Sequence, residues 1–377
     1  MTNNVRRYHV RRAALALALP IALLAALLFL EAQRASADPT PPQTGSHFVV
    51  DTLSDHNDAK CGVTGCSLRE AVTAANESRE PASISFSRSG TIVLTAALPA
   101  ISNAVTIDAS DANITISGNH QVQVFSVTDS GALTLRNLTI TAGAADNGAG
   151  VSNLGALTVV NSTFSDNHAE LLGGAIYNNI GATLQVVSSS FIDNSSKQIG
   201  GAIANGGAAD VTNSTFAGNN ASGSAVLANS GTLALTSSTV TGNGTSLGAG
   251  PAIENYFAEA VIRNSIVANN GGGDCLKTGG TLADGGYNLG GDDSCFYSST
   301  SKLNVRVKFD PAGLRQNGGP VKTLALLKDS AGIDAIPQGV NGCGSAVATD
   351  ARGVARPQGA GCDIGAFELL ADTGRQH

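Results

Sequence analysis

The segments ALTVVNSTFSDNHAELLGGAIYNN (residues 156–179) and TLQVVSSSFIDNSSKQIGGAIAN (183–205) share one pattern of apolar, polar and glycine positions. Extending the alignment outward from them finds one bulky apolar residue in each unit, at intervals of 24 to 27 residues. This column consists of Ile140, Phe164, Phe191, Phe216, Val240 and Val267. A nearly fixed period of this length indicates repeats that stack into a solenoid.

Alternate residues before this column are also apolar, which is the period of a β-strand. Five residues before it stand Leu135, Val159, Val186, Val211, Leu235 and Ile262. Each unit holds two or three short strands separated by Gly/Asn turns, and no helical 3.6-residue pattern lies between them, which excludes leucine-rich and ankyrin-type repeats. We therefore expect an all-β right-handed parallel β-helix with roughly 24–27 residues per turn, in which inward side chains stack on their own kind.

Asparagine recurs at two further positions of the unit. Three residues before the aromatic position stand Asn137, Asn161, Asn213 and Asn264, and three residues after it stand Asn167, Asn194, Asn219, Asn243 and Asn270. Asparagine tolerates the left-handed conformation of a tight turn, and its amide can bond to the same residue one turn away. Both columns are therefore predicted to be structural ladders at the corners of the solenoid.

The N-terminus has the order of a secretory signal peptide. Arg6, Arg7, Arg11 and Arg12 precede an apolar stretch over 13–30, and Ala35-Ser36-Ala37 offers a cleavage site. We expect residues 1–37 to be a signal peptide and 38–47 a linker, with an uncleaved membrane anchor as the alternative. Removing residues 1–37 changes the net charge from −7 to about −11, because five arginines and one glutamate leave. Such a chain repels nucleic acid and anionic lipid.

An exported chain permits disulfides, and the six cysteines form three sequence-local pairs. The pairs are Cys61 with Cys66, Cys275 with Cys295, and Cys343 with Cys362. Proximity alone favours this pairing over the other arrangements. Metal binding is the competing interpretation.

A solenoid needs caps at its ends, and residues 48–80 are predicted to supply the first. Ser67 followed by Glu70 is a capping box, and Leu68, Ala71, Val72 and Ala75 fall on one face of a short helix. The run from Cys66 to Ala71, CSLREA, resembles the motif for which CSLREA-domain proteins are named. The β-helix itself is expected over 81–300.

The C-terminal region 301–368 resembles the choice-of-anchor type Q region that follows such β-helices, through DPAGLRQNGGPVKTLALLKDSAGIDA, TDARGVARP and GCDIGAFE. The resemblance implies a pectin-lyase-like β-helix that is secreted or attached to the cell surface. We expect the run of Ile364, Ala366 and Phe367 to pack against the last turn as the far cap. Residues 369–377 are read as a frayed tail, because LADTG is not followed by the apolar segment of an anchor.

No set of residues has the pattern of a catalytic site. Asp166 and Asp193 stack at one corner, Arg136 and Arg263 occupy similar places in their turns, and His120 and His168 are expected to be isolated. Polysaccharide lyases need clustered carboxylates with a basic residue beside them, and glycosidases need two carboxylates across the sugar. We therefore predict no catalytic residues and no cofactor.

One loop contains spaced acids, Asp51, Asp55 and Asp58, beside Cys61. Spaced oxygen ligands in a flexible loop suit calcium, so a calcium site is the alternative to a solvated loop there.

Taken together, the sequence predicts a secreted or cell-surface binding or structural protein whose partners are polysaccharide or other surface components. The runner-up is a polysaccharide lyase or glycoside hydrolase, which would have to gather at least two ionisable groups in one groove.

Overall fold

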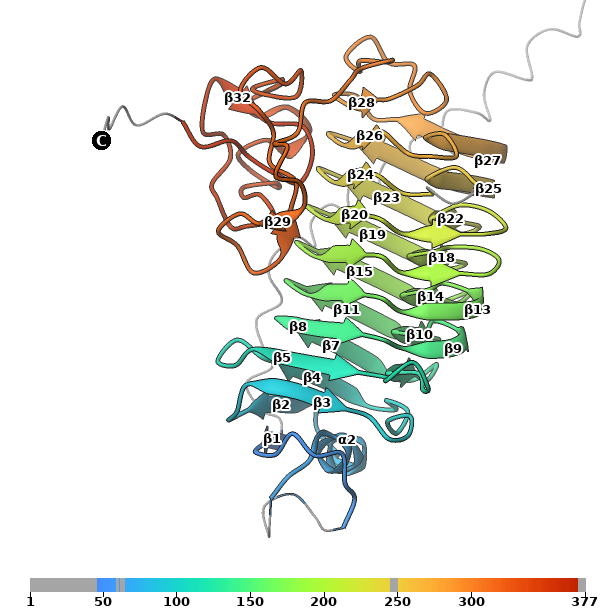
Figure 1. Ribbon diagram of the computed structural model, residues 1–377, viewed down its shortest axis with the longest axis vertical. Coiled ribbons are helices and arrows are strands. Elements are labelled where there is room, and N and C mark those ends of the chain that lie inside the picture. The colour runs from blue at the N-terminus through green and yellow to red at the C-terminus, as the bar shows by residue number, and fades with distance from the viewer. Residues whose placement is uncertain (1–45, 59–60, 62–64, 245–249, 372–377) are drawn as a thin grey trace, which may run out of the picture. The chain divides into compact units, whose positions relative to one another are not determined.

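The computed structural model describes residues 46–58, 61, 65–244 and 250–371. The predicted signal peptide lies outside these residues, as do most of the predicted linker and tail. No helix among the described residues is long and apolar enough to cross a membrane. The described chain forms a right-handed parallel β-helix of about eight turns (Figure 1). The fold class predicted from the repeat is therefore confirmed.

The largest of the three parallel sheets has 15 strands and joins two columns, because β25 (Ile253–Arg263) is long enough to belong to both. The first column contains β1 (Ser46–Val50), β2 (Ala82–Phe86), β4 (Ala104–Asp108), β7 (Ala132–Arg136), β11 (Ala156–Val160), β15 (Thr183–Val187), β19 (Ala208–Thr212) and β23 (Thr232–Thr236). The second contains β6 (Phe125–Val127), β10 (Val151–Asn153), β14 (Ile176–Asn178), β18 (Ile203–Asn205) and β22 (Leu227–Asn229). The last strand of this sheet, β27 (Cys275–Asp284), pairs with β25 along its length.

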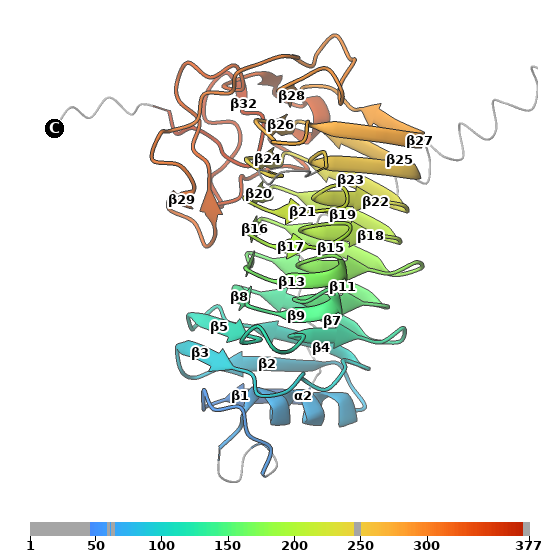
Figure 2. The ribbon, with the colours of Figure 1, turned by 45° about the vertical axis from the view of Figure 1, so that its right-hand side comes forward.

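The other two parallel sheets have nine and four strands, so the smaller one extends over four turns only. The nine-stranded sheet contains β3 (Gly90–Val93), β5 (Ile114–Ser117), β8 (Leu138–Thr141), β12 (Thr163–Ser165), β16 (Ser190–Ile192), β20 (Thr215–Ala217), β24 (Thr239–Thr241), β26 (Ile266–Ala268) and β28 (Leu289–Gly290). The four-stranded sheet contains β9 (Ala144–Asn147), β13 (His168–Leu172), β17 (Ser195–Ser196) and β21 (Asn220–Ala221). Figure 2 shows these short strands stacked along the middle of the molecule.

The apolar columns predicted from the sequence form the core. Phe164 pairs in register with Phe191, and Phe191 with Phe216, and all three rings are fully buried. Their ring centroids are 5.2 and 4.7 Å apart, with planes inclined by 9° and 6°. Each turn therefore repeats the inward side chain of the turn before it, and the stacked rings exclude water from the centre.

The asparagine column after the aromatic position forms an amide ladder. Nδ2 of Asn167 donates to Oδ1 of Asn194 at 2.9 Å, and this bond repeats from Asn194 through Asn219 and Asn243 to Asn270 at 2.9 to 3.1 Å. A second ladder of 2.7 Å bonds, which the sequence analysis did not predict, runs through Asn153, Asn178, Asn205, Asn229 and Asn255. Two buried rows of amides thus link successive turns.

The other predicted ladder does not form. Asn137, Asn161, Asn213 and Asn264 have the expected left-handed backbone, with φ between 50° and 57°. In the described part of the chain, however, their side chains do not bond to one another: Asn137 donates to Asp108, and Asn213 and Asn264 donate to the carbonyls of Thr349 and Asn341. Asn213 and Asn264 thus bind the C-terminal region that lies beside the solenoid, whereas Asn137 bonds within the solenoid.

The N-terminal cap is the helix α2 (Leu68–Glu77), as predicted. The Ser67 hydroxyl accepts from the Glu70 backbone N–H, and the Glu70 carboxylate accepts from the Ser67 N–H. Leu68, Ala71, Val72 and Ala75 are buried against the first turn. The helix therefore covers the open end of the core with its apolar face.

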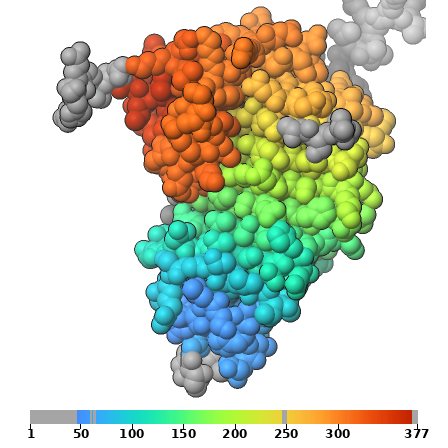
Figure 3. Space-filling model, in the orientation of Figure 1, coloured from blue at the N-terminus to red at the C-terminus, as the bar shows by residue number. Residues whose placement is uncertain are grey.

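The C-terminal region packs along the side of the β-helix, which differs from the far cap expected at the last turn (Figure 1 and Figure 3). The Ser190 hydroxyl donates to the Lys322 carbonyl, and the Ala366 N–H donates to the Thr239 hydroxyl. Outward-facing Ile266 and Ala268 form a second core with this region. Apolar side chains on the outer face of the last strands explain this lateral packing, because they need cover from water.

This region contains little regular structure beyond two short pairs, β29 (Arg315–Gln316) with β30 (Lys322–Thr323) and β31 (Ile336–Pro337) with β32 (Gly361–Cys362), and the 3₁₀ turn η2 (Val340–Gly342). Disulfides join Cys343 to Cys362, Cys275 to Cys295 at the end of the solenoid, and Cys61 to Cys66 in the N-terminal loop. These are the three sequence-local pairs.

A buried ion pair also holds the C-terminal region together. Arg356, 4% exposed, donates to the Glu368 carboxylate at 3.0 Å and to the carbonyls of Asp363 and Gly365 at 2.6 Å. Burial raises the pKa of the Asp363 carboxyl to about 6. Arg356 of the motif TDARGVARP and Glu368 of GCDIGAFE therefore serve the internal packing of the C-terminal region.

Candidate functional sites

The predicted calcium loop does not gather its three acids. Asp55 accepts from Arg69 Nε and Nη2 at 2.9 and 2.8 Å and from Thr95, and these bonds lower the pKa of its carboxyl although burial opposes them. Asp51 accepts the Cys66 N–H at 2.7 Å, while the side chain of Asp58 is largely exposed. Two of the three carboxylates therefore hold the cap, and calcium binding by this set stays a prediction.

The same loop gathers a different set of side chains. Within the described residues, one group of three could hold a metal ion: His56, Asp58 and Glu70, whose ligand atoms all lie within 4.8 Å of one another. The sequence does not reveal this group, because the capping box alone accounts for Glu70 and His56 belongs to no motif.

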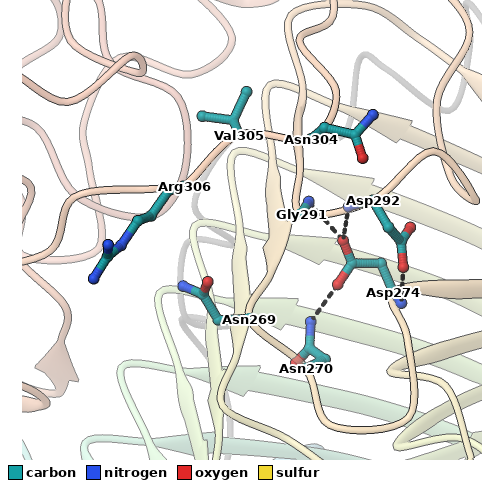
Figure 4. A pocket seen from close by; sticks show the side chains of 8 residues that line it. All are labelled: Asn269, Asn270, Asp274, Gly291, Asp292, Asn304, Val305 and Arg306. Carbon is teal, nitrogen blue, oxygen red and sulfur yellow. Dashed lines mark hydrogen bonds between the residues drawn. The ribbon is translucent and has the colours of Figure 1, made fainter.

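A polar hollow lies at the C-terminal end of the solenoid (Figure 4). It measures about 330 Å³ and is lined by Asn269, Asn270, Asp274, Gly291, Asp292, Asn304, Val305 and Arg306. It contains two carboxylates, which is the minimum that the enzyme hypothesis requires. The chemistry of the hollow therefore depends on whether those carboxylates are free to act.

Both carboxylates are engaged in structural hydrogen bonds. Asp274 accepts from the Asn270 amide at 3.0 Å and from the N–H groups of Gly291 and Asp292 at 2.6 and 3.1 Å. Asp292 accepts from the Asp274 N–H at 3.0 Å and from Ser294. Burial raises the pKa of Asp274, whereas the bonds from Ser294 lower that of Asp292 against the effect of burial. Asp274 thus ends the asparagine ladder, and Figure 4 shows Arg306 directed away from both acids.

A third cluster surrounds His168, which the sequence analysis expected to be isolated. Nδ1 of His168 lies 2.9 Å from the Ser195 hydroxyl, and Nε2 lies 3.6 Å from Glu170, which pairs with Lys197 at 2.5 Å. The expectation was wrong because the stacking of turns brings β13 beside β17, 27 residues apart. His120 likewise lies 3.4 Å from Asp166.

The His168 cluster has the residue types of a hydrolytic triad and lacks its environment. The side chains of His168 and Glu170 are 40% and 49% exposed, and the histidine–glutamate distance exceeds a hydrogen bond. A triad depends on a tight hydrogen bond to the acid and on exclusion of water. We therefore assign this cluster no catalytic role.

An exposed apolar surface lies on the last two strands of the large sheet. Tyr256 and Phe257 of β25 and Leu276 of β27 are 54%, 71% and 46% exposed, and we call these three residues the aromatic patch. The two rings meet edge to face with centroids 4.9 Å apart. Aromatic side chains are normally buried or found at binding surfaces, so this patch is the strongest candidate for a contact site.

The backbone at the aromatic patch is unusual as well. In the turn before it, Ser230 and Gly231 connect the two strand columns, whereas Tyr256, Phe257 and Ala258 occupy this position in β25. Phe257 has φ 49°, and its ring lies over Gly279, where a Cβ would stand 2.6 Å from the ring. A bulky residue in the left-handed region is strained by about 1–2 kcal/mol. This site was not predicted from the sequence, although the Tyr256-Phe257 pair differs visibly from Ser230-Gly231 of the unit before.

Comparison with known proteins agrees with this fold. Residues 103–283 match the family described as the right handed beta helix region. Pectate lyase Pel9A has a similar structure, with a TM-score of 0.51 and 14% identity over 87% of this chain and 97% of that one. The major cedar pollen allergen Jun a 1 gives a TM-score of 0.38 and 15% identity over 68% of this chain and 84% of that one. No curated protein matches the sequence. The family match and the likeness to Pel9A thus show the pectin-lyase-like right-handed β-helix fold.

Proposed function

We propose that this protein is an exported carbohydrate-binding protein that contacts a neutral polysaccharide through the aromatic patch. The observation that carries the proposal is the pair of exposed rings at Tyr256 and Phe257, one of them on a strained backbone. Flat aromatic faces stack on the apolar faces of sugar rings. A rigid strand presents them with little loss of conformational entropy on binding.

Two features support the substrate class. The fold is that of a pectate lyase, a protein that acts on a polysaccharide, so an elongated β-helix can present a surface to a long glycan. The chain carries a net charge of −7, which repels acidic glycans such as polygalacturonate. The charged residues beside the patch are also more negative than positive, because Glu254 and Glu259 stand against Lys277 alone. We therefore favour a neutral glycan.

We also propose that the chain is a CSLREA-domain protein with a choice-of-anchor type Q region, secreted or held at the cell surface. The roles of the motif residues support this: Cys66, Leu68 and Ala71 are buried, and Ser67 and Glu70 cap the helix. The disulfides agree with an extracellular setting.

The test is affinity electrophoresis of the purified protein in gels containing neutral glucans, xylans or polygalacturonate, with parallel assays for unsaturated and reducing ends. The double variant Tyr256→Ala/Phe257→Gly is expected to bind at least tenfold more weakly than the wild type. Tyr297→Ala, which removes another exposed ring near the far end of β27, serves as the matched control and is expected to bind normally. Unchanged binding by the patch variant refutes the proposal, and release of new chain ends by the wild type favours the lyase or hydrolase alternative.

A further inference from the structure

We propose that His56, Asp58 and Glu70 form a binding site for a transition-metal dication, with Zn²⁺ as the best match. Nε2 of His56 lies 3.6 Å from Oδ1 of Asp58 and 3.7 Å from Oε2 of Glu70. A tetrahedral Zn²⁺ with bonds of about 2.0–2.1 Å separates its ligand atoms by about 3.3–3.4 Å. The ligand atoms of Asp58 and Glu70 lie within 4.8 Å of each other. Shifts of up to about half an ångström would therefore bring all three atoms to bonding distance from one ion.

The loop is held in place by contacts that do not involve the ion. The Ser67 hydroxyl donates to the His56 carbonyl at 2.6 Å, and the Asp58 N–H donates to Oε1 of Glu70 at 3.1 Å. On the other side of the loop, Asp55 is bound to Arg69, and the disulfide from Cys61 ties the chain to the start of α2. Preorganised ligands lose little entropy when they bind a metal.

Glu70 can serve the helix cap and the ion together. Its Oε2 accepts the Ser67 N–H at 2.9 Å, and a carboxylate oxygen has a second lone pair. The side chain is only 2% exposed, so its position is fixed by the surrounding cap. The ligand from the helix is thus rigid, and the two from the loop close on it.

The ligand set selects the kind of metal. One imidazole with two carboxylates suits Zn²⁺ and neighbouring transition metals, whereas calcium prefers six to eight oxygens. The two carboxylates balance the charge of a dication. The positive end of α2 opposes binding of a cation, but this effect is weak compared with direct coordination by three ligands. The bound ion would fasten the N-terminal loop onto the helix that covers the core.

The experiment is isothermal titration of the chelator-treated full-length protein with Zn²⁺ and, separately, with Ca²⁺, together with the visible absorption of the Co²⁺ complex. We expect one Zn²⁺ site per chain that His56→Asn and Asp58→Asn each weaken at least tenfold. Glu70 is left unchanged because it caps the helix.

His168→Asn is the matched control, because His168 also lies 3.6 Å from a glutamate but belongs to no three-residue group among the described residues. This variant is expected to keep Zn²⁺ affinity within twofold of the wild type. The Co²⁺ spectrum should show the strong bands of four-coordination and lose them in His56→Asn. The proposal is overturned if both loop variants bind Zn²⁺ like the wild type, if no Zn²⁺ binds, or if Ca²⁺ binds more tightly than Zn²⁺.

Discussion

The buried asparagine ladder should contribute far more to stability than the asparagines of the outward corner. Asn219 lies in the middle of the ladder and is fully buried. Its Oδ1 accepts from the backbone N–H and the side-chain amide of Asn194 at 3.0 and 2.9 Å, and its amide donates to Asn243 and to the carbonyl of Phe191. Asn219→Ala removes all four of these bonds.

Two of the lost bonds leave buried N–H groups of Asn194 without an acceptor: its backbone N–H and one N–H of its side-chain amide, whose other N–H still donates to the Phe164 carbonyl. Each orphaned N–H costs about 1–3 kcal/mol. Oδ1 of Asn243 loses the amide bond but still accepts the backbone N–H of residue 219. We therefore expect Asn219→Ala to lower the free energy of unfolding by about 3 kcal/mol. Equilibrium unfolding in urea, followed by far-ultraviolet circular dichroism, measures this change, provided that the slope against urea stays constant.

The control is the same residue type in the outward column. Asn161 has φ 50° and is half-buried, and its side chain joins neither ladder. Asn161→Gly keeps the left-handed backbone accessible and should change the unfolding free energy by less than about 1 kcal/mol. Equal costs at Asn161 and Asn219, or a smaller cost at Asn219, would refute this account of how the turns are held together.

Three other perturbations test the patch and the C-terminal region. Phe257→Gly should be more stable than Phe257→Ala by about 1 kcal/mol in thermal unfolding, because alanine retains the left-handed strain and glycine does not. Arg356→Met should destabilise the fold by about 3–5 kcal/mol in urea, because it leaves Glu368 buried without its cation. The Asp363 carboxyl, with a pKa of about 6 in the fold and about 3.9 when unfolded, stabilises fully below about pH 4 and loses this contribution as the pH rises through 6. The melting temperature should therefore fall from pH 5 to pH 7 less in Asp363→Asn than in the wild type, and an equal fall would contradict the assignment.

The sequence predicted the core well because a solenoid repeats its inward residues. Phe164, Phe191 and Phe216 could be placed in register from spacing alone, since each meets the same residue of the next turn. The capping helix followed from a local motif, Ser67 with Glu70, which needs no knowledge of distant contacts. Local and periodic signals are therefore sufficient for the β-helix and its first cap.

Periodicity could not tell which asparagine column faces inward. Strand alternation assigns a side chain to one face or the other, but a left-handed residue such as Asn161 breaks that alternation at the corner. The asparagine three residues before the aromatic position and the asparagine three residues after it therefore look equivalent in the sequence. Only the three-dimensional corner shows that Asn167 lies inside and Asn161 outside.

The lateral packing of the C-terminal region also depends on information outside any single unit. The outward residues of the nine-stranded sheet change from Thr139 and Thr163 in the earlier turns to Ile266 in a late one. That change is visible in the sequence once the outward column is known, and it marks the strands that need cover. The C-terminal region that covers these strands lies about 40 to 100 residues further along the chain. It has no periodic pattern that would connect it with the strands.

In a solenoid, the residues that break a column carry more information about binding than the residues that keep it. The stacked columns already satisfy the demands of folding, so a departure that lowers stability needs another explanation. Phe257 occupies a turn that Ser230 and Gly231 make in the unit before, adopts a backbone that favours glycine, and leaves most of its ring in water. Each of these features costs free energy in the isolated chain, whereas a ligand that covers the ring would offset the exposure. This imbalance is the physical reason for placing the contact surface at the aromatic patch.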